Sequence, residues 1–354
     1  MAYLLVVSDF HLGAGAWLPS GRANLLEDFF LDEKFVEFLD YYCSDSYRRE
    51  DVTLVLNGDF LNFLQVQDAT PDEFTTISEE SALRRLNKIF EGHKFLFDGL
   101  RDFASTTNHR IVYVEGNHDS VVIFPKVRQA IKDRIGAEVH FPGLIYQVDS
   151  EVYIEHGHRF DVNNYTENTQ EEVLAGKISI PWGSRFIVYV LTQLKSERPF
   201  IDKVVPLKNY VRWALFNDIR FIMKAGFVSA RFFLSKKFDP TSRFPSIRGL
   251  LNLFRTPNSY NDLEPRAHEI LEQGLAKIVV FGHTHGFIIR QVDYQKYYLN
   301  TGTWNVCTGM SIENLGRHLD LTYAFLEKHH EKWVPKLLEW KGAQHEIAKV
   351  IVPT

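Results

Sequence analysis

The sequence predicts an α/β fold in which short buried strands alternate with helices. Two observations carry this prediction. Apolar runs recur along the chain, and five of them end in a turn that holds Asp, Asn or His. Between the first runs lie longer segments whose apolar residues repeat every three or four positions, as in amphipathic helices. Strands that lack polar alternation are buried on both faces, so we expect a sheet covered by further layers.

The first part of the chain contains three strand–helix pairs. The expected strands are apolar runs that stop at a turn, and the expected helices carry apolar side chains at helical spacing. In chain order these elements are a strand at 3–7, a helix at 25–42, a strand at 52–56, a helix at 81–103, a strand at 111–114 and a helix at Pro125–Ile135.

The second part adds two more buried strands and a group of antiparallel ones. Buried strands are expected at 152–154 and Ile278–Phe281, and antiparallel strands at 287–292, 297–299 and 321–326. The segment between the two buried strands has apolar and aromatic residues that recur every three or four positions. It predicts helices over 181–194, 206–224 and 227–237.

Composition is that of an ordinary soluble globular protein. The chain has 354 residues, which allows one large domain or two smaller ones. Apolar residues make up 45% and charged residues 24%, which excludes collagen-like, disulfide-scaffold and wholly disordered proteins. Cys43 and Cys307 cannot build a disulfide framework and suggest a reducing compartment. The chain start does not resemble a signal peptide and no apolar run is long enough for a membrane span, so we expect a cytoplasmic location.

Charge is distributed unevenly along the chain. Residues 176–260 include 15 basic and 4 acidic side chains, a net charge of +11, whereas the whole chain carries −5 and the remainder therefore −16. We interpret residues 166–261 as a basic, aromatic-rich helical cap inserted into an acidic body formed by residues 1–165 and 262–354.

The turns after five strands carry side chains of the types that bind metal ions. In open α/β sheets, ligands sit at the carboxyl ends of the strands. Asp-x-His and His-x-His place two side chains on one side of an extended strand end, because side chains alternate with a period of two. The candidates are Asp9 and His11, Asp59, Asn117 and His118, His156 or His158, and His283 and His285.

Oxygen and imidazole ligands without thiolates suit Mn, Fe or Zn in an open site rather than a structural zinc knot. Without His118 these candidates number seven, which exceeds the needs of one tetrahedral ion but fits two divalent ions that share a carboxylate. Two ions about 3.5–4 Å apart can clamp the attacking and leaving oxygens of an in-line displacement and lower the pKa of a bridging water. The resulting hydroxide requires no Ser or Cys nucleophile.

The five turns, taken in order, resemble the calcineurin-like metallophosphoesterase family. The motifs are Asp-x-His at 9–11, Gly-Asp at 58–59, Gly-Asn-His-Asp at 116–119, His-Gly-His at 156–158 and Gly-His-Thr-His at 282–285. Residues 299–304 are similar to the strand and turn that follow the last motif. The resemblance covers 1–160 and 277–326. It implies a four-layer αββα sandwich of two mixed sheets, flanked by helices and extended by the inserted cap.

The resemblance also implies a role for each motif residue. The metal ligands would be Asp9, His11 and His285 for one ion, Asn117, His156 and His283 for the other, and Asp59 as the bridge. His118 would contact the phosphoryl group and help to protonate the leaving oxygen, and Asp119 would orient His118. Manganese is the ion that we expect first, with iron or zinc as alternatives.

Further residues beside the motifs are candidates for contact with substrate. They are His158, Arg159, Asn164 and Arg22, and Asp161 could support the fourth motif in a similar way. The remaining histidines lack ligand spacing, so we expect surface or structural roles for them.

The place of the insertion resembles that in UDP-2,3-diacylglucosamine hydrolases, in which a helical cap between the fourth and fifth motifs receives acyl chains. Position 118 is His here, where that group usually has Arg. A basic lid beside the metal centre would attract a phosphorylated substrate. Basic helices with Phe and Trp could also lie on an anionic membrane surface, which would make the protein peripheral, and nucleic acid is the partner that we favour least.

We therefore expect a dinuclear-metal-dependent hydrolase of phosphoester or pyrophosphate bonds. Its substrate would be a phosphorylated lipid or small molecule, or a nucleotide conjugate similar to a UDP-sugar lipid. Two alternatives stay open: a nuclease or phosphodiesterase that acts on nucleic acid, and a non-catalytic scaffold that keeps the fold. Every motif retains its ligand, which argues against the scaffold. The sequence carries no information on the oligomeric state.

Overall fold

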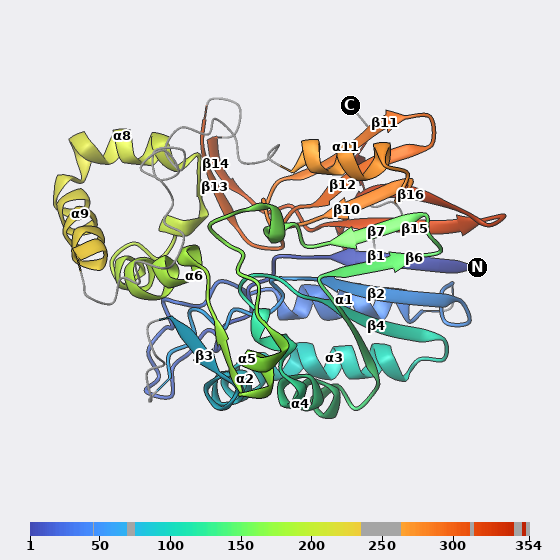
Figure 1. The fold of residues 1–354 in the computed structure, drawn as a ribbon, viewed down its shortest axis with the longest axis horizontal. Coiled ribbons are helices and arrows are strands. Elements are labelled where there is room, and N and C mark those ends of the chain that lie inside the picture. Colours follow the sequence, from blue (N-terminus) through green and yellow to red (C-terminus); the bar gives the residue numbers. More distant parts are fainter. Residues whose placement is uncertain (45, 69–74, 235–262, 312–314, 343–348, 352–354) are drawn as a thin grey trace.

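The computed structural model describes residues 1–44, 46–68, 75–234, 263–311, 315–342 and 349–351. Two large sheets form the centre of the molecule (Figure 1). Across the larger sheet the strands are β17 (Lys349–Ile351), β16 (Lys332–Glu339), β15 (Thr322–His329), β1 (Ala2–Val7), β2 (Asp51–Asn57), β4 (His109–Val114) and β5 (Val139–Gly143). Across the smaller sheet they are β11 (Phe287–Asp293), β12 (Lys296–Thr301), β10 (Ile278–Phe281), β7 (Val152–Glu155) and β6 (Ile145–Val148).

Both sheets are mixed. In the larger sheet β1, β2 and β4 pair in parallel, and β15 pairs antiparallel with β1. In the smaller sheet β10 lies parallel to both β7 and β12, and β11 runs antiparallel to β12. The parallel strands bring their carboxyl ends to one edge of each sheet, which is where the predicted ligand turns begin.

Side-chain alternation along the strands explains why two sheets and two outer layers are needed. Leu4 and Val6 of β1 belong to the core between the sheets, whereas Leu5 and Val7 belong to the core beneath the helices. Strand β10 repeats the pattern on the other sheet, because Val280 faces the first sheet and its neighbours face a helix. Both faces of each central strand are therefore apolar, as the sequence predicted.

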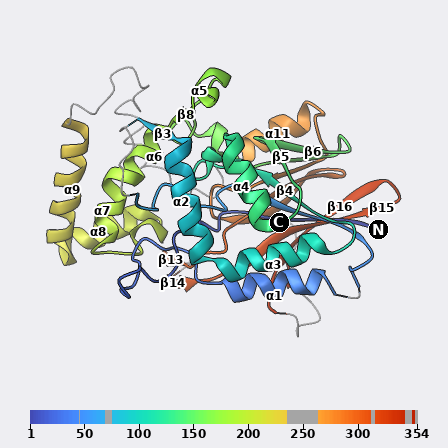
Figure 2. The same cartoon turned by 90° about the horizontal axis from the view of Figure 1, so that it is seen from below.

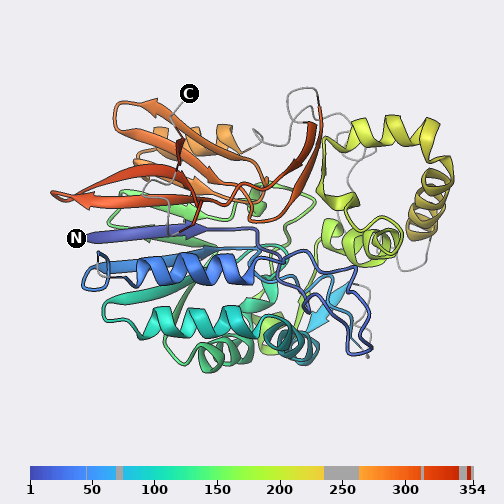
Figure 3. The ribbon, with the colours of Figure 1, turned by 180° about the vertical axis from the view of Figure 1, so that it is seen from behind.

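Helices cover the outer faces of the two sheets (Figure 3). The larger sheet is covered by α1 (Asp32–Tyr42), α2 (Glu79–Gly92), α3 (Lys94–Ser105) and α4 (Pro125–Ile135), and the smaller sheet by α11 (Glu264–Glu272). The order of layers is helix, sheet, sheet, helix. The predicted four-layer αββα sandwich of two mixed sheets is thus confirmed.

Two helix predictions need correction near the site. The helix expected at 25–42 begins only at Asp32, because the Glu27 carboxylate accepts hydrogen bonds from the backbone N–H groups of Gly13, Gly15 and Phe29 and fixes this segment as a loop. The single helix expected at 81–103 is two helices, α2 and α3. They separate at His93, whose backbone is not helical (φ −121°, ψ 36°).

His93 connects this break to the loop. Its Nδ1 lies 2.8 Å from Asp32 Oδ1, and its Nε2 lies 3.4 Å from Glu27 Oε2. The imidazole is buried, so both carboxylates act on it with little solvent screening. The residue at the break is thus tied through its side chain to the segment before α1, a contact that apolar periodicity alone could not reveal.

The cap is a separate group of helices at one end of the molecule (Figures 1 and 2). The helix expected at 181–194 is found as α6 (Trp182–Phe186), a π-helical turn η3 (Ile187–Leu191) and α7 (Thr192–Lys195) in succession. Helices α8 (Leu207–Asn217) and α9 (Ile219–Leu234) follow. They separate at Asp218, which accepts from Arg198, and not after residue 224 as expected. The predicted end at residue 237 lies outside the described residues.

Short strands and turns complete the structure. Strand β3 (Thr76–Ser78) pairs with β8 (Lys177–Ser179), and β13 (Cys307–Met310) pairs with β9 (Val204–Val205) and β14 (Leu315–His318). The remaining helical segments are η1 (Ser120–Ile123), η2 (His158–Phe160), α5 (Gln170–Leu174) and η4 (Ile201–Lys203). Ile178 and Ile180 join the core of the body, so the first residues of the insertion pack with the body. Within the described ranges, every helix is too short or too polar to cross a bilayer.

The contacts of His93 predict a pH-dependent contribution to stability. Burial alone would lower the pKa of His93, but Asp32 and Glu27 raise it to about 9. Because this value exceeds the unfolded value near 6.5, the stabilisation is complete below about pH 6.5 and is lost as the pH rises through about 9. We expect His93→Gln to lower the free energy of unfolding by about 3 kcal/mol at pH 6 and by much less at pH 10.

Urea unfolding of both proteins across this pH range measures the difference. His140→Gln, at an exposed histidine, is the control and should leave stability unchanged at every pH. A constant difference between wild type and His93→Gln would contradict the assignment.

Candidate metal centre

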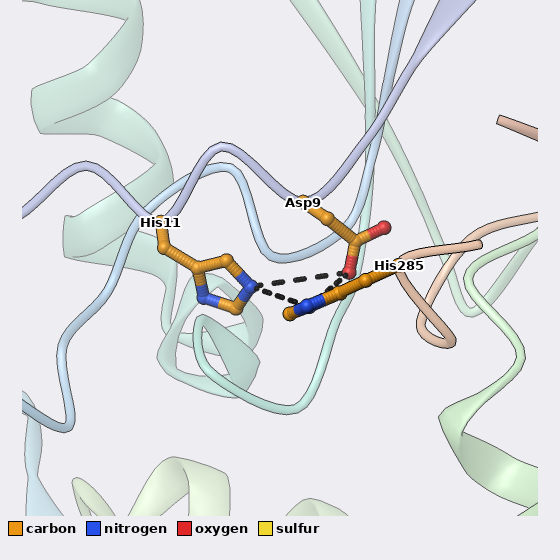
Figure 4. A group of neighbouring side chains, drawn as sticks. All are labelled: Asp9, His11 and His285. Carbon is orange, nitrogen blue, oxygen red and sulfur yellow. Dashed lines mark hydrogen bonds and ion pairs between the residues drawn. The ribbon is translucent and has the colours of Figure 1, made fainter. Parts of the chain in front are cut away.

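The predicted ligands converge where the carboxyl ends of the two sheets meet. Asp9 and His11 follow β1, whereas His285 follows β10 of the other sheet, more than 270 residues later (Figure 4). His285 Nε2 lies 3.4 Å from Asp9 Oδ1 and 3.1 Å from His11 Nε2. Residues that are distant in sequence are therefore neighbours here because the sheets pack face to face.

The turns adopt a backbone conformation that residues other than glycine rarely accept. Five predicted ligands have positive φ angles, namely Asp9 (57°), His11 (55°), Asp59 (50°), His283 (68°) and His285 (59°). For an L-residue the left-handed region costs roughly 1–2 kcal/mol. Such strain persists only where surrounding contacts impose it, and it gathers at functional sites.

Contacts between neighbouring turns impose this conformation. The backbone N–H groups of Asp9 and His11 donate to the carbonyl oxygens of Gly58 and Asp59 at 3.2 and 2.9 Å. Side chains of Thr303 and Asn305 donate to the carbonyl oxygen of Asp9. The stretch after β12, which the resemblance singled out, therefore supports the first motif.

Glycine is required at two close approaches. A Cβ on Gly116 would lie 2.3 Å from the backbone nitrogen of Asp59, and a Cβ on Gly58 would lie 2.5 Å from the His156 ring. Any side chain at these positions would separate the second motif from the third or fourth. The glycines thus permit the crowding of polar side chains that defines the site.

Three groups of side chains hold their ligand atoms within 4.8 Å of one another. They are Asp9, His11 and His285; His11, Asp59 and His118; and Asp59, His156 and His283. Asp59 belongs to two groups, and its Oδ2 lies 3.3 Å from His156 Nε2 and 3.9 Å from His11 Nε2. This central place is the one that a bridging carboxylate requires.

Several ligand atoms have no hydrogen-bond partner although they are buried. Asp9 Oδ1, His156 Nε2 and Asn117 Oδ1 have none in the part of the chain that the structure describes. An unsatisfied buried polar atom costs roughly 1–3 kcal/mol, and more when it is charged. Divalent cations would satisfy these atoms, and oxygen and imidazole donors without thiolate suit them. The residues therefore fit a site for two divalent ions.

The electrostatics of the cluster couple metal binding to the release of a proton. Burial would lower the pKa of His156, but the carboxylates of Asp59 and Asp9 raise it to about 10. Burial would likewise raise the pKa of Asp59, whereas His156 and His118 hold it well below its usual range. A ligand imidazole must be neutral, so uptake of a cation displaces a proton from His156.

His118 is held by a residue that the sequence did not indicate. Its Nδ1 lies 3.1 Å from Asn62 Oδ1, and its backbone N–H donates to Asp59 Oδ1 at 2.8 Å. Asn62 follows the second motif by three positions, and nothing in its spacing marks it. The contact fixes the ring and leaves Nε2 for the cluster.

Asp119 has contacts other than the one predicted. We expected it to orient His118, but its carboxylate accepts from the Tyr113 hydroxyl at 2.7 Å and from the backbone N–H groups of Gly116 and Phe60 at 2.8 and 3.0 Å. Asp119 thus ties the third motif to the second, and Asn62 contacts the imidazole instead.

The weaker candidates divide into two groups. Asn164 donates to Asp161 at 2.7 Å, and Asp161 Oδ2 lies 3.4 Å from His283 Nε2, so both support the fifth motif. His158 is buried, with its ring 5.4 Å from that of His156. It lies outside the three groups of ligand atoms.

The two arginine candidates are engaged elsewhere. Arg159 donates at 2.8 Å to Glu155, which is fully buried. Arg22 lies in an exposed loop and contacts Ser20. Arg159 thus forms an ion pair with Glu155, and substrate contact by either arginine stays a prediction.

A buried ion network joins the cap to the body beside the cluster. Lys195 Nζ lies 2.7 Å from Asp28 Oδ1, 2.8 Å from Gln65 Oε1 and 2.8 Å from Asp202 Oδ2. Lys203 donates to the carbonyl oxygen of Asp28 at 2.9 Å. Lys195 is inaccessible to solvent, so removal of one partner would leave an uncompensated buried charge.

This fold and donor set are those of a metal-dependent hydrolase. The family model for calcineurin-like phosphoesterase matches residues 2–287, and the chain belongs to this family. The predictions of the family and of a metal-dependent phosphoester hydrolase are thereby confirmed, while the subgroup stays a prediction. A search of curated proteins returned no match.

Among solved structures, similarity is distributed over the whole chain at low identity. A dimetal phosphatase from Danio rerio matches with 11% identity, a TM-score of 0.36 and coverage of 96% of this chain and 95% of its own. Zinc-bound Vps29 from Entamoeba histolytica matches with 11% identity, a TM-score of 0.31 and coverage of 99% and 97%. A 5'-nucleotidase from Candida albicans matches with 10% identity, a TM-score of 0.36 and coverage of 96% and 52%. The family assignment rests on the family model.

Replacement of Asp59, the predicted shared ligand, or of His283, a predicted ligand on the second sheet, should abolish hydrolysis. We expect Asp59→Ala and His283→Ala to lose activity on 4-nitrophenyl phosphate and bis(4-nitrophenyl) phosphate with manganese present, because either change opens the coordination of an ion. Bound metal, measured by elemental analysis, should fall in both variants. Full activity in either would contradict the site, and His140→Ala is the matched control on an exposed histidine.

Loss of the Asn62 contact should reduce turnover more than substrate binding. Asn62→Leu removes the acceptor at His118 Nδ1 and frees the ring, so we expect kcat to fall roughly 10- to 100-fold, as for other residues that orient an imidazole in a metal centre. Steady-state kinetics on 4-nitrophenyl phosphate measure the change. Asn62→Asp keeps an acceptor and should retain more activity; equal losses in both variants would show that the contact with His118 is not responsible.

Proposed function

We propose that this phosphoesterase hydrolyses a phosphoester or pyrophosphate bond in a substrate that carries an apolar chain, as a phosphorylated lipid or a lipid-linked nucleotide does. One observation supports this proposal. A cavity of about 450 Å³ is lined at one end by His11, His118 and His285. The rest of its wall includes the apolar cap residues Phe186, Leu191, Leu194, Val211, Phe221 and Ile222.

The size and lining of this cavity suit an amphiphilic molecule. Small-molecule sites typically have volumes of about 300–1,000 Å³ and mostly apolar walls with a few polar groups. The cap supplies the apolar wall, and the polar groups are those of the ligand cluster together with Asp28, Gln65, Asp202, Lys203, Tyr210, Ser229 and Asn305. The phosphoryl group would lie at the cluster, with the apolar chain between α8, α9 and α6.

The reaction places distinct demands on the protein's own residues. Two divalent ions, when bound, activate a water and neutralise charge on the phosphoryl oxygens; manganese is the ion that we propose, and iron or zinc suit the same donors. Burial lowers the pKa of His118, so its ring is neutral before substrate enters. A phosphoryl group beside Nε2 favours the protonated ring, which can then donate its proton to the leaving oxygen.

A homologous series of substrates tests the apolar part of this proposal. In alkyl 4-nitrophenyl phosphates from methyl to octyl, each buried methylene is worth about 0.8 kcal/mol, or roughly fourfold in kcat/KM. We expect the rate to rise along the series until the cavity is filled.

A variant that fills the cavity should remove this preference. Ala225 lines the cavity, so Ala225→Trp should lower kcat/KM for the octyl ester while the methyl ester is affected little. Ala230→Trp is the matched control, because Ala230 lies on the exposed side of the same helix. No dependence on chain length in the wild type, with activity on short esters intact, would contradict an apolar substrate.

A further inference from the structure

Helix α9 presents to solvent a face that is apolar and basic. Four apolar residues occur on it at helical spacing, with exposed fractions of 49% for Ile219, 69% for Met223, 69% for Phe227 and 85% for Leu234. Arg220 and Arg231 are exposed between them, and α9 contains no acidic residue. The solvent side of a surface helix is normally polar, so an exposed apolar face of this kind indicates an interaction site.

The end of α8 extends this surface. Trp213 and Phe216 are 48% and 89% exposed, and Arg212 is exposed beside them. Together α8 and α9 contain five basic residues and no acidic one, and Asp218, which lies between the two helices, accepts hydrogen bonds from Arg198. Both helices lie at the end of the molecule remote from the sheets (Figures 1 and 2).

The other faces of α9 have separate structural duties. Phe221 and Phe232 are buried in the apolar core of the cap. Ile222, Ala225 and Ser229 line the cavity that begins at the ligand cluster. The exposed face is thus not used to hold the described part of the cap together. One helix separates the cavity from the apolar outer surface.

We propose that the exposed face of α9, with the end of α8, docks on a lipid bilayer that contains anionic lipids. The aliphatic and aromatic side chains would enter the region between headgroups and acyl chains, and the arginines would contact lipid phosphates. The benefit to catalysis rests on the proposed function, because docking would bring the cavity beside a membrane that holds amphiphilic substrates.

Two other occupants fit these residues less well. Single-stranded nucleic acid binds by stacking on aromatic rings, but Ile219, Met223 and Leu234 offer no ring and gain most by entering hydrocarbon. A symmetric contact with a second copy would bring Arg220 and Arg231 against the same arginines, with no acidic residue of α9 to compensate them.

Vesicle flotation of the full chain tests the proposal. We expect protein to float with vesicles of phosphatidylcholine and phosphatidylglycerol, and at least tenfold less with phosphatidylcholine alone. Raising the salt to about 0.5 M, where the Debye length is on the order of 4 Å, should weaken the binding. Protein that stays at the bottom of the gradient with anionic vesicles at low salt would overturn the proposal.

Two double variants test the basic and the apolar residues of the surface separately. Arg220→Glu with Arg231→Glu should lower partitioning onto anionic vesicles at least tenfold, and Phe216→Ser with Phe227→Ser should do the same. The controls are Arg48→Glu with Arg49→Glu and the single change Tyr294→Ser, all exposed residues of the body. Equal binding by the α9 variants and the controls would overturn the proposal.

Turnover of a soluble substrate distinguishes this proposal from the preceding one. The surface variants should hydrolyse butyl 4-nitrophenyl phosphate at the wild-type rate, because their residues do not line the cavity. Vesicle binding without a chain-length preference would refute the proposed substrate class and support docking. A chain-length preference without vesicle binding would do the reverse.

If single-stranded DNA binds and vesicles do not, or light scattering shows dimers that the same variants dissociate, another partner uses this face and docking on lipid is refuted.

Discussion

Mutual proximity of buried carboxylates and imidazoles is the constraint on which the rest of this structure depends. Two aspartates and five histidines hold ligand atoms within 4.8 Å in overlapping groups, and several of those atoms have no partner among the described residues. Left-handed backbone at five of these positions, and glycine wherever a Cβ would collide, are local consequences of that crowding. Cations at the site would compensate the strain and the unsatisfied atoms together.

The body and the cap contribute different residues to the site. Two sheets bring the ligand turns together, and the apolar cavity begins at those turns and continues into the cap. The buried Lys195 network fixes the cap to the body at the wall of the same cavity, because Asp28, Gln65 and Asp202 line it as well. The body thus supplies the ligand cluster, and the cap supplies the apolar lining of the same cavity. The outer side of the cap is then free for a second task, which we propose is contact with lipid.

Local pattern was enough to predict much of this architecture from the sequence. The strand ends, α4 and the motif turns were predicted because apolar runs, and the turn residues that end them, are local properties of the sequence. The break at His93 and the loop at Glu27 were missed, since the Glu27 carboxylate reaches the His93 imidazole and the backbone N–H of Gly13 only after folding. Asn62 escaped notice for a similar reason: its contact with His118 spans 56 residues. The role expected for Asp119 came from resemblance, whereas its bonds to Tyr113 and Gly116 could not be predicted from the motif. The metal ligands themselves stay predictions, although the fold brings them together.

Anomalous scattering from crystals grown with manganese tests the central claim most directly. The account predicts two peaks about 3.5–4 Å apart with Asp59 between them. One peak should lie beside Asp9, His11 and His285, and the other beside Asn117, His156 and His283. A single peak, two peaks too distant to share Asp59, or the absence of any peak at these residues would contradict it.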